Sequence, residues 1–246
     1  MPAIQSMYVR EVGWASGASV SLSETEPAVR GQAEAVWGLV DAFDGLVVNR
    51  RIGSATNASK AYQLELISRC GFQVPRTLVT CDPDAASAFW HEMAGQVIYK
   101  SVSAERSIVH SLEADDLGRL ERIRSCPLQL QERIPGVDLR VHVVGERVFA
   151  TEVRSDASDY RYAERSGAER TMRPVELPDT VARQCVGLTR ELGLVLSGVD
   201  LRRTPQGAYY CFEVNPSPAY LWFEDVTGQR IGEALANLLC RGNTWN

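Results

Sequence analysis

The spacing of hydrophobic residues changes at about residue 128, and this change divides the chain into two unlike parts. Before this point, segments with apolar residues three and four positions apart predict helices, and short apolar runs between them predict strands. The expected helices cover 31–43, 57–70, 82–93 and 114–125, and the expected strands cover 8–10, 46–48, 75–80 and 96–100. Such an alternation is typical of a small α/β subdomain.

After residue 128, short segments rich in apolar residues predict strands separated by turns. A strand over 129–134 leads into the turn Pro135-Gly136, and the next two strands form a hairpin across Gly145-Glu146. The segment 155–173 is polar and rich in arginine, and it has no apolar period, so we expect a loop. The remaining elements are the hairpin strands 138–144 and 147–153, a second hairpin of 195–201 and 208–214, and helices over 178–192 and 231–239.

These patterns predict an α+β protein with three consecutive parts. A short N-terminal region covers 1–47, a small subdomain with a preceding helix covers 48–127, and a β-rich subdomain covers 128–246. A chain of 246 residues is long enough to bury a sizeable core and form one large domain or two small ones.

Composition narrows the class of protein further. The formal net charge of −5 argues against a general nucleic-acid binder. No apolar run approaches the roughly 18 residues of a membrane span, and the start of the chain lacks the features of a signal peptide. The six cysteines include no CxxC pair and are typical of reduced thiols. We therefore expect a cytoplasmic, soluble protein without a membrane or nucleic-acid partner.

Lysine is almost absent from the chain. Of the 26 basic residues only Lys60 and Lys100 are lysines, and the others are arginines. Lys60 lies at the start of a helix with Asn57 as its N-cap and Gly71 beyond its end, and Lys100 ends a predicted strand. A composition biased towards arginine is one explanation. The positions of the two lysines favour another, because a compact ammonium group suits contact with a nucleotide phosphate.

The second predicted hairpin carries an acidic group of residues. Asp200 on one strand would lie near Glu213 and Asn215 on the other, and the latter two share one face because strand side chains alternate. Two like charges about 4 Å apart repel by roughly 4 kcal/mol near a protein surface, so we expect a cation between them. Mg²⁺ prefers such oxygen ligands. The alternative is a solvated hairpin whose acids do not converge.

Taken together, these residues resemble the ATP-grasp ligases. The resemblance rests on Lys60, Lys100, the strand 130–134, Asp138-Leu139-Arg140, and Asp200 with Glu213-Val214-Asn215-Pro216. The chain is most similar to the RimK-like branch, which includes the peptide-modifying ligases of the microviridin (graspetide) type. The segments 71–80, 159–161 and 221–229 resemble that branch in particular, and the similarity runs from about 48 to 239.

The resemblance implies an ATP-grasp fold, in which two α+β subdomains hold ATP between them, here with a reduced N-terminal region. The residues implied to contact ATP are Lys60 and Lys100 at the phosphates, Gln131, Glu132 and Ile134 at the adenine, and Asp138 at the ribose. The residues implied to hold Mg²⁺ are Asp200, Glu213 and Asn215, and Arg140 and Arg161 would steady the transferred phosphoryl group and the acyl phosphate.

The activity implied by the resemblance is an ATP- and Mg²⁺-dependent, ADP-forming ligation. A substrate carboxylate attacks the γ-phosphate to give an acyl phosphate, and an amine or hydroxyl then displaces phosphate to form an amide or ester. The carboxylate belongs to a peptide or to a small molecule such as an amino acid. The arginines of 154–173 fit an acidic substrate, although a solvated loop in an arginine-rich protein explains them equally well.

Two features depart from the pattern of the family. The loop 101–107, which follows the second lysine, contains no glycine, whereas many ATP-grasp enzymes have a glycine-rich loop there. The short N-terminal region would also leave apolar surface that a second subunit could cover, which makes a homodimer a hypothesis. Two other functions therefore stay open: a non-catalytic subunit that binds a nucleotide or peptide, and a kinase that stops at phosphate transfer.

Overall fold

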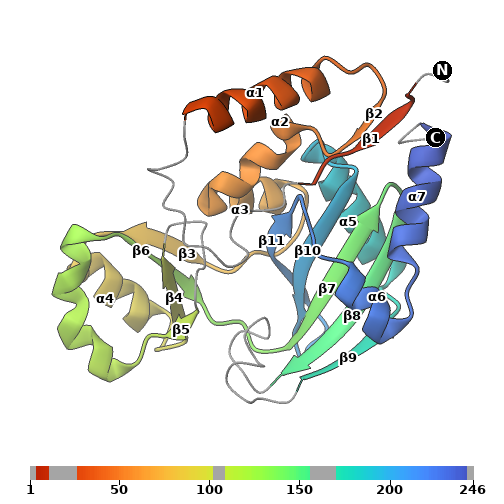
Figure 1. Ribbon diagram of the computed structural model, residues 1–246. Coiled ribbons are helices and arrows are strands. Elements are labelled where there is room, and N and C mark those ends of the chain that lie inside the picture. The colour runs from red at the N-terminus through yellow and green to blue at the C-terminus, as the bar shows by residue number, and fades with distance from the viewer. Residues whose placement is uncertain (1–3, 11–26, 102–108, 156–169, 243–246) are drawn as a thin grey trace.

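The structure is a computed structural model and describes residues 4–10, 27–101, 109–155 and 170–242 (Figure 1). The described strands form three sheets, and the two larger ones are well separated in Figure 1. One has four strands and the other has five, and every neighbouring pair in both is antiparallel. The mixture of helices and antiparallel sheets confirms the expected α+β class.

The four-stranded sheet has the order β3-β6-β4-β5. Helix α4 (Pro83–Glu92) and the 3₁₀ helix η3 (Ala114–Ser125) cover one of its faces. Helix α4 begins as its sequence indicates, because the Asp82 side chain accepts a hydrogen bond from the Asp84 backbone N–H and Pro83 occupies the first turn. The strands are β3 (Thr77–Thr80), β4 (Val97–Ser101), β5 (His110–Ser111) and β6 (Leu128–Glu132).

Strand β6 differs from the expectation in its sheet membership. The sequence pattern placed the segment after residue 128 with the β-rich part, but β6 pairs with both β3 and β4 in the smaller sheet. Alternation along one strand predicts which side chains share a face and does not identify the partner strands. The wider division into 1–47, 48–127 and 128–246 stays a prediction, with β6 counted in the smaller sheet.

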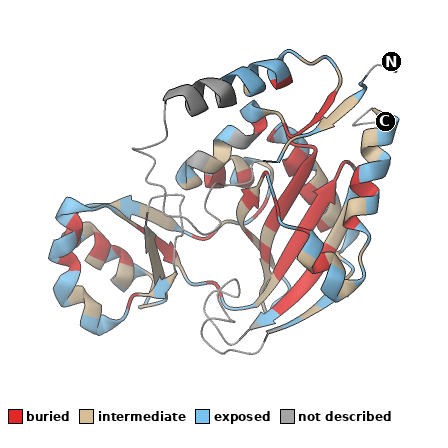
Figure 2. Cartoon of the chain, in the orientation of Figure 1, coloured by how far each residue is buried: buried red, intermediate tan, exposed pale blue. Residues whose placement is uncertain are grey.

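The five-stranded sheet has the order β11-β10-β7-β8-β9 and is covered on both faces. Helices α3 (Lys60–Arg69) and α5 (Asp179–Glu191) pack on one face, and α6 (Leu221–Thr227) and α7 (Ile231–Arg241) pack on the other. Figure 2 shows the resulting band of buried residues along its central strands. The strands are β7 (Val137–Val144), β8 (Arg147–Ser155), β9 (Arg170–Val175), β10 (Leu196–Arg203) and β11 (Tyr209–Asn215).

Three local expectations need correction. Helix α3 is capped by Ser59, not by Asn57, because α2 (Arg51–Ser54) and the 3₁₀ helix η2 (Ala55–Ala58) take up the residues before it. The polar segment 155–173 is not a loop throughout, since β9 pairs with β8 at the sheet edge. An edge strand exposes much of its length and therefore has little apolar alternation to detect. Helix α6 was not expected as an element at all.

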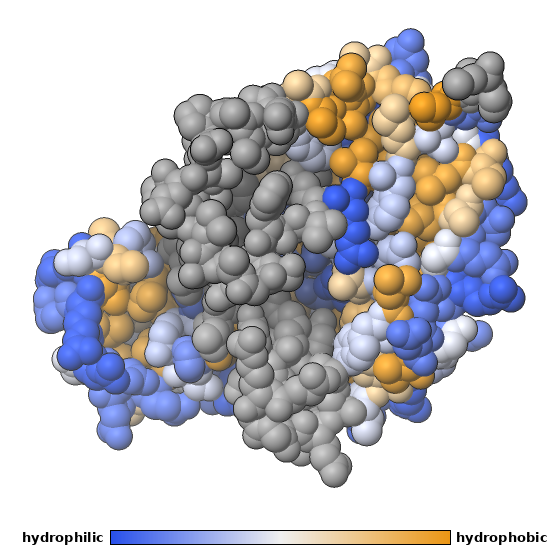
Figure 3. All heavy atoms as spheres, viewed as in Figure 1, coloured by the Kyte–Doolittle hydropathy of each residue, from blue (hydrophilic) through white to orange (hydrophobic). Residues whose placement is uncertain are grey.

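The N-terminal region joins the large sheet through short elements. Helix α1 (Pro27–Asp41) lies in the chain between β1 (Ser6–Tyr8) and β2 (Leu46–Val48), and these two strands form a parallel sheet. The Arg50 guanidinium donates hydrogen bonds to four carbonyls after and at the end of α1, and the Ser6 hydroxyl donates one to α7. Figure 3 shows hydrophobic residues gathered over this upper part of the molecule.

No helix within the described ranges has both the length and the apolar character needed to cross a membrane.

Candidate active site

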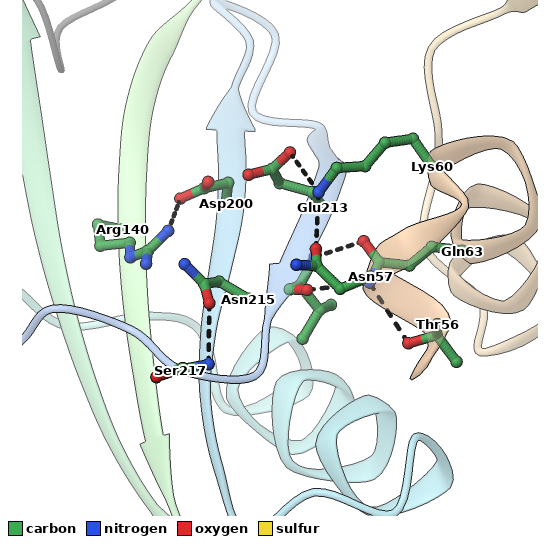
Figure 4. A network of polar contacts seen from close by, with 10 residues as sticks. Thr56, Asn57, Lys60, Gln63, Arg140, Asp200, Glu213, Asn215 and Ser217 are labelled. Atoms are coloured by element: carbon green, nitrogen blue, oxygen red, sulfur yellow. Dashed lines mark hydrogen bonds and ion pairs between the residues drawn. The ribbon is translucent and has the colours of Figure 1, made fainter. Parts of the chain in front are cut away.

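The acidic residues of the β10–β11 hairpin converge as the sequence predicted. Asp200 lies opposite Glu213, and Gly198 lies opposite Asn215, so all four positions share one face of the sheet. The pairing shifts just after Asp200, where the register passes from Glu213 to Cys211. Figure 4 shows the Asp200, Glu213 and Asn215 side chains on the same side of the two strands.

Each of the two carboxylates contacts a basic side chain. Arg140 on β7 donates a hydrogen bond to Asp200 at 2.5 Å, and the Lys60 ammonium lies 3.2 Å from the Glu213 carboxylate. Lys60 also donates to the Asn57 side chain at 2.7 Å. These cations offset much of the repulsion between the acids, so the charge argument for a metal is weaker than the sequence suggested.

The oxygen atoms of the candidate metal ligands are nevertheless of the type that Mg²⁺ prefers. Asp200, Glu213 and Asn215 supply two carboxylates and a carboxamide oxygen, which are hard oxygen ligands. The Asn215 oxygen accepts a hydrogen bond from the Ser217 backbone N–H at 2.8 Å, which orients the side chain. Within the described part of the chain, no group of three or more His, Cys, Asp or Glu side chains could hold a metal, so the candidate set depends on the amide.

Gly198 makes room for the Arg140 guanidinium. A Cβ atom at position 198 would lie 2.5 Å from an Arg140 nitrogen and 2.8 Å from the Pro218 Cβ. Both separations are shorter than a van der Waals contact allows. The absence of a side chain at this position therefore lets Arg140 lie flat beside Asp200, and sequence reasoning did not identify this role.

A second ion pair lies where the ribose contact was expected. Arg202 on β10 lies opposite Asp138 on β7 and contacts its carboxylate at 2.6 Å. The same guanidinium donates to the Ile134 carbonyl at 2.9 Å. Arg202 therefore links two of the predicted ATP contacts, Asp138 and Ile134. No local sequence signal indicated this role, because the pairing of β10 with β7 joins segments that are far apart in the chain.

The predicted contacts on the smaller sheet share a face only in part. Lys100 lies opposite Gln129, and Gln131 follows two residues later, so the three point away from the apolar core of that sheet. Gln131 donates to the Thr77 hydroxyl at 3.0 Å. The side chain of Glu132 instead accepts from the Arg76 backbone N–H at 3.2 Å. Lys100 thus comes from the small sheet and Lys60 from helix α3, which packs on the large sheet, and Arg161 lies outside the described residues.

His142 is buried on the same face of β7 as Arg140. Its ring packs against Phe223 with 4.8 Å between centroids. Burial, together with the nearby Arg140 charge, lowers the pKa of His142 from its usual value to about 3. The side chain is therefore neutral near pH 7, which suits its packing against Phe223.

The two sheets, with one lysine on the small sheet and the other at an acidic hairpin of the large sheet, have the architecture of the ATP-grasp fold. The chain belongs to the family described as the RimK-like ATP-grasp domain, whose model matches residues 57–239.

Solved structures agree with this assignment. The chain is similar to the ATP-grasp ligase PsnB complexed with a minimal precursor, with a TM-score of 0.83, 31% identity, and coverage of 96% of this chain and 78% of that chain. It is also similar to PsnB complexed with a phosphomimetic variant of the minimal precursor, Mg and ADP, with a TM-score of 0.81, 29% identity, and coverage of 97% and 79%.

Curated proteins give more distant relatives. The chain is 24% identical over 201 residues to a probable alpha-L-glutamate ligase 2 of Shewanella amazonensis, covering 78% of this chain and 66% of the relative. The chain thus spans about two thirds of the length of such relatives.

Proposed function

We propose that this protein is an ATP- and Mg²⁺-dependent ligase that activates a carboxylate as an acyl phosphate and transfers it to an amine or hydroxyl, releasing ADP and phosphate. The observation that carries this proposal is the hairpin site, where Lys60 meets Glu213 and Arg140 meets Asp200 within a RimK-like ATP-grasp domain. Phosphoryl transfer needs positioning and charge stabilisation and requires no protein nucleophile, which suits a site of this composition.

The residues divide into phosphate, metal and nucleoside contacts. Lys60 on α3 and Lys100 on β4 would bind the phosphates. Asp138, held by Arg202, would bind the ribose next to an adenine contact at Ile134. Asp200, Glu213 and Asn215 would hold magnesium, which when bound supplies positive charge to the β- and γ-phosphates.

The contribution of arginine to the reaction is electrostatic. Arg140 would exchange part of its contact with Asp200 for the oxygens of the transferred phosphoryl group, where it would stabilise the negative charge spread over them in the transition state. Arg161 is assigned the same role on the resemblance alone.

The favoured substrate is an acidic peptide. PsnB, which resembles this chain, binds a precursor, and basic side chains gather on β8, β9 and β10. Arg154, Arg173 and Arg203 all contact the buried Glu152 carboxylate at 2.8–3.0 Å. Burial opposes ionisation of Glu152, but the hydrogen bonds from Arg154 and Arg173 lower its pKa overall. Three guanidinium groups around one carboxylate leave an excess of positive charge for an acidic partner.

The relatives favour a second candidate. Several are named probable alpha-L-glutamate ligases, and these are 24–27% identical to this chain. A small-molecule version of the reaction would add a free amino acid, with the same acyl phosphate chemistry.

One experiment separates the candidates. Purified protein is incubated with ATP, Mg²⁺ and either an acidic peptide or free glutamate with an acceptor, and ADP release is followed with hydroxylamine present or absent. A ligase converts added hydroxylamine to a hydroxamate and otherwise forms an amide or ester, which mass spectrometry detects as loss of water. A kinase yields a stable phosphorylated product instead. ADP release no higher than that of the Glu213→Gln variant would reject catalysis and leave a binding subunit.

A homodimer would cover the apolar surface of the N-terminal region. The exposed side chains there include Ile4, Val36 and Leu39, and Ile52 follows shortly after the region. Light scattering at micromolar protein concentration should then give twice the mass of the chain, and a monomeric mass would contradict this assembly.

A further inference from the structure

Strand β11 forms one edge of the large sheet, and its outer backbone groups find partners that do not belong to a strand. Val214 lies between Glu213 and Asn215. Its N–H donates to the Gln63 side-chain oxygen at 2.9 Å, and its carbonyl accepts from the Gln63 side-chain nitrogen at 2.9 Å. A carboxamide has the same donor and acceptor arrangement as a peptide group, so Gln63 acts as a one-residue extension of the sheet.

A second carboxamide holds the backbone on the other side of Asn215. The Asn49 nitrogen donates to the Pro216 carbonyl and to the Leu196 carbonyl, each at 2.6 Å. The Asn49 oxygen accepts from the backbone N–H groups of Val195 and Leu196 at 2.8 and 3.1 Å. Asn49 therefore fixes the turn after β11 to the start of β10.

Both carboxamides are almost inaccessible to solvent. Gln63 is 1% exposed and Asn49 is 6% exposed. Neighbours of Gln63 on α3, Leu64 and Ile67, pack in the apolar core, where a buried amide is costly unless its hydrogen bonds are made. Core packing alone therefore does not favour a glutamine at position 63, whereas holding Val214 requires one.

The position of Gln63 connects two parts of the candidate site. Gln63 follows Lys60 by one helical turn on α3, and Lys60 contacts the Glu213 carboxylate next to Val214. Figure 4 shows Lys60 and Gln63 reaching the same strand from the same helix. A shift of α3 would therefore move the Lys60 contact and the Val214 contact together.

We propose that Gln63 and Asn49 are positioning residues that hold the backbone on both sides of Asn215, so that Glu213 and Asn215 present their oxygens in a geometry ready for metal-bound nucleotide. This inference rests on the proposed function, since it concerns the same metal and nucleotide. Neither residue touches the nucleotide in this scheme, and each acts through Glu213 and Asn215.

The test compares ADP binding with and without metal. Isothermal titration calorimetry measures the affinity for ADP in excess Mg²⁺ and again in EDTA, and the ratio of the two affinities is the gain from the metal. Gln63→Met keeps the side-chain length but cannot form either hydrogen bond. We expect this gain to fall by about tenfold or more, as when supporting contacts of metal ligands are removed, with ADP affinity in EDTA unchanged.

A matched control removes a buried hydrogen bond elsewhere in the same unit. Thr189 on α5 and Ser197 on β10 pair through their hydroxyl groups at 2.7 Å, and both are buried. Thr189→Val should therefore lower stability without changing the gain from Mg²⁺. An equal loss of the gain in both variants would show a general loss of stability and would overturn the inference. The inference would also be overturned if Gln63→Met showed the same gain in ADP affinity from Mg²⁺ as the wild type.

If Gln63→Met does not fold, Gln63→Glu provides a second test of the positioning role. An ionised carboxylate accepts from the Val214 N–H but cannot donate to its carbonyl, whereas the protonated acid can do both, and burial raises its pKa. The gain relative to wild type should therefore recover from about pH 8 to about pH 6. The other charged members of the network in Figure 4, Lys60, Arg140, Asp200 and Glu213, are present in both proteins, so their own titration cancels in this ratio. Their charges act on the new carboxyl group in opposite directions, because the basic groups lower its pKa and the acidic groups raise it.

The absence of recovery with Gln63→Glu would reject the positioning role. Wild-type protein that binds ADP equally well with Mg²⁺ and with EDTA would instead reject the metal assignment in the proposed function.

Discussion

The two larger sheets differ in how helices cover them and in the partners of their polar side chains. The five-stranded sheet has helices on both faces, and its polar site residues have partners within the protein, such as Arg140 for Asp200 and Lys60 for Glu213. The four-stranded sheet packs helices on one face, and its other face carries Lys100, Gln129 and Gln131. The nitrogen of the buried Gln129 amide has no hydrogen-bond partner among the described residues.

This difference indicates a division of work between the sheets. The large sheet holds charged groups in a fixed arrangement before any ligand arrives, which reduces the reorganisation that catalysis requires. The small sheet offers a polar face that a nucleotide would complete. Substitutions of Arg140 and of the acidic hairpin residues on the large sheet should therefore strongly lower turnover, whereas substitution of Lys100 on the small sheet should mainly affect nucleotide affinity.

The strongest challenge to this division is Glu213→Gln. Loss of the carboxylate should lower turnover by about a hundredfold or more, on the scale seen when a charge-stabilising group is removed. ADP release at saturating Mg²⁺ measures this. Glu121→Gln, which alters an exposed ion pair on η3, serves as the control and should leave turnover unchanged. Equal turnover of wild type and Glu213→Gln would remove the metal site from the large sheet.

Gly198→Ala tests the fixed position of Arg140. The added methyl group would meet the Arg140 guanidinium at 2.5 Å and push it from Asp200, so we expect kcat to fall. A misplacement of about 1 Å in a catalytic group costs up to roughly a hundredfold in rate. Gly187→Ala is the matched control, because nothing lies within 4 Å of its added Cβ and a helical alanine is favourable. If the two variants have the same kcat, the position of Arg140 does not limit catalysis.

Lys100→Met tests the small sheet. Removing one charge-assisted contact to phosphate should weaken ATP binding by about tenfold, seen as a raised KM for ATP with a smaller change in kcat. Arg119→Met, on an exposed part of η3, is the control and should leave the KM unchanged. A large fall in kcat with an unchanged KM would show that the small sheet also shapes the transition state.

His142 is expected to affect stability and not activity. Its pKa is about 3 when folded and 6.5 ordinarily, so the unfolded chain binds the proton more readily between these values. Stability from this group is present above about pH 6.5 and is lost on acidification, by roughly 1.4 kcal/mol per pH unit. Urea unfolding of wild type and His142→Leu at several pH values from about 7 to about 5 measures it. Parallel pH dependences would show that His142 is not held neutral.

Local signals predicted much of the fold. The β7–β8 hairpin followed from its alternation and the Gly145-Glu146 turn, and α4 followed from Asp82 and Pro83. These features depend on residues close together in the chain. Strand β9 was missed because an edge strand needs no apolar alternation, and the cap of α3 was misplaced because a preceding 3₁₀ turn shifted the helix start to Ser59.

The candidate site was predictable to the extent that it lies on one hairpin. The β10 and β11 strands are neighbours in the chain, so their alternation and turn indicated that Asp200, Glu213 and Asn215 would share a face. The partners of these residues come from distant segments. Lys60 and Gln63 approach from α3, and Gln63 lies 151 positions before Val214.

The sequence by itself determined the α+β class, the two hairpins, the resemblance to a ligase family and the acidic residues of its candidate site. Only the tertiary structure decided that β6 joins the smaller sheet, that Arg202 holds Asp138, and that Gln63 and Asn49 hold the strand beneath Asn215. The physical reason is the distance along the chain over which each kind of interaction acts. Alternation and turn chemistry act over a few residues, whereas strand partners and buried hydrogen bonds depend on how whole elements pack.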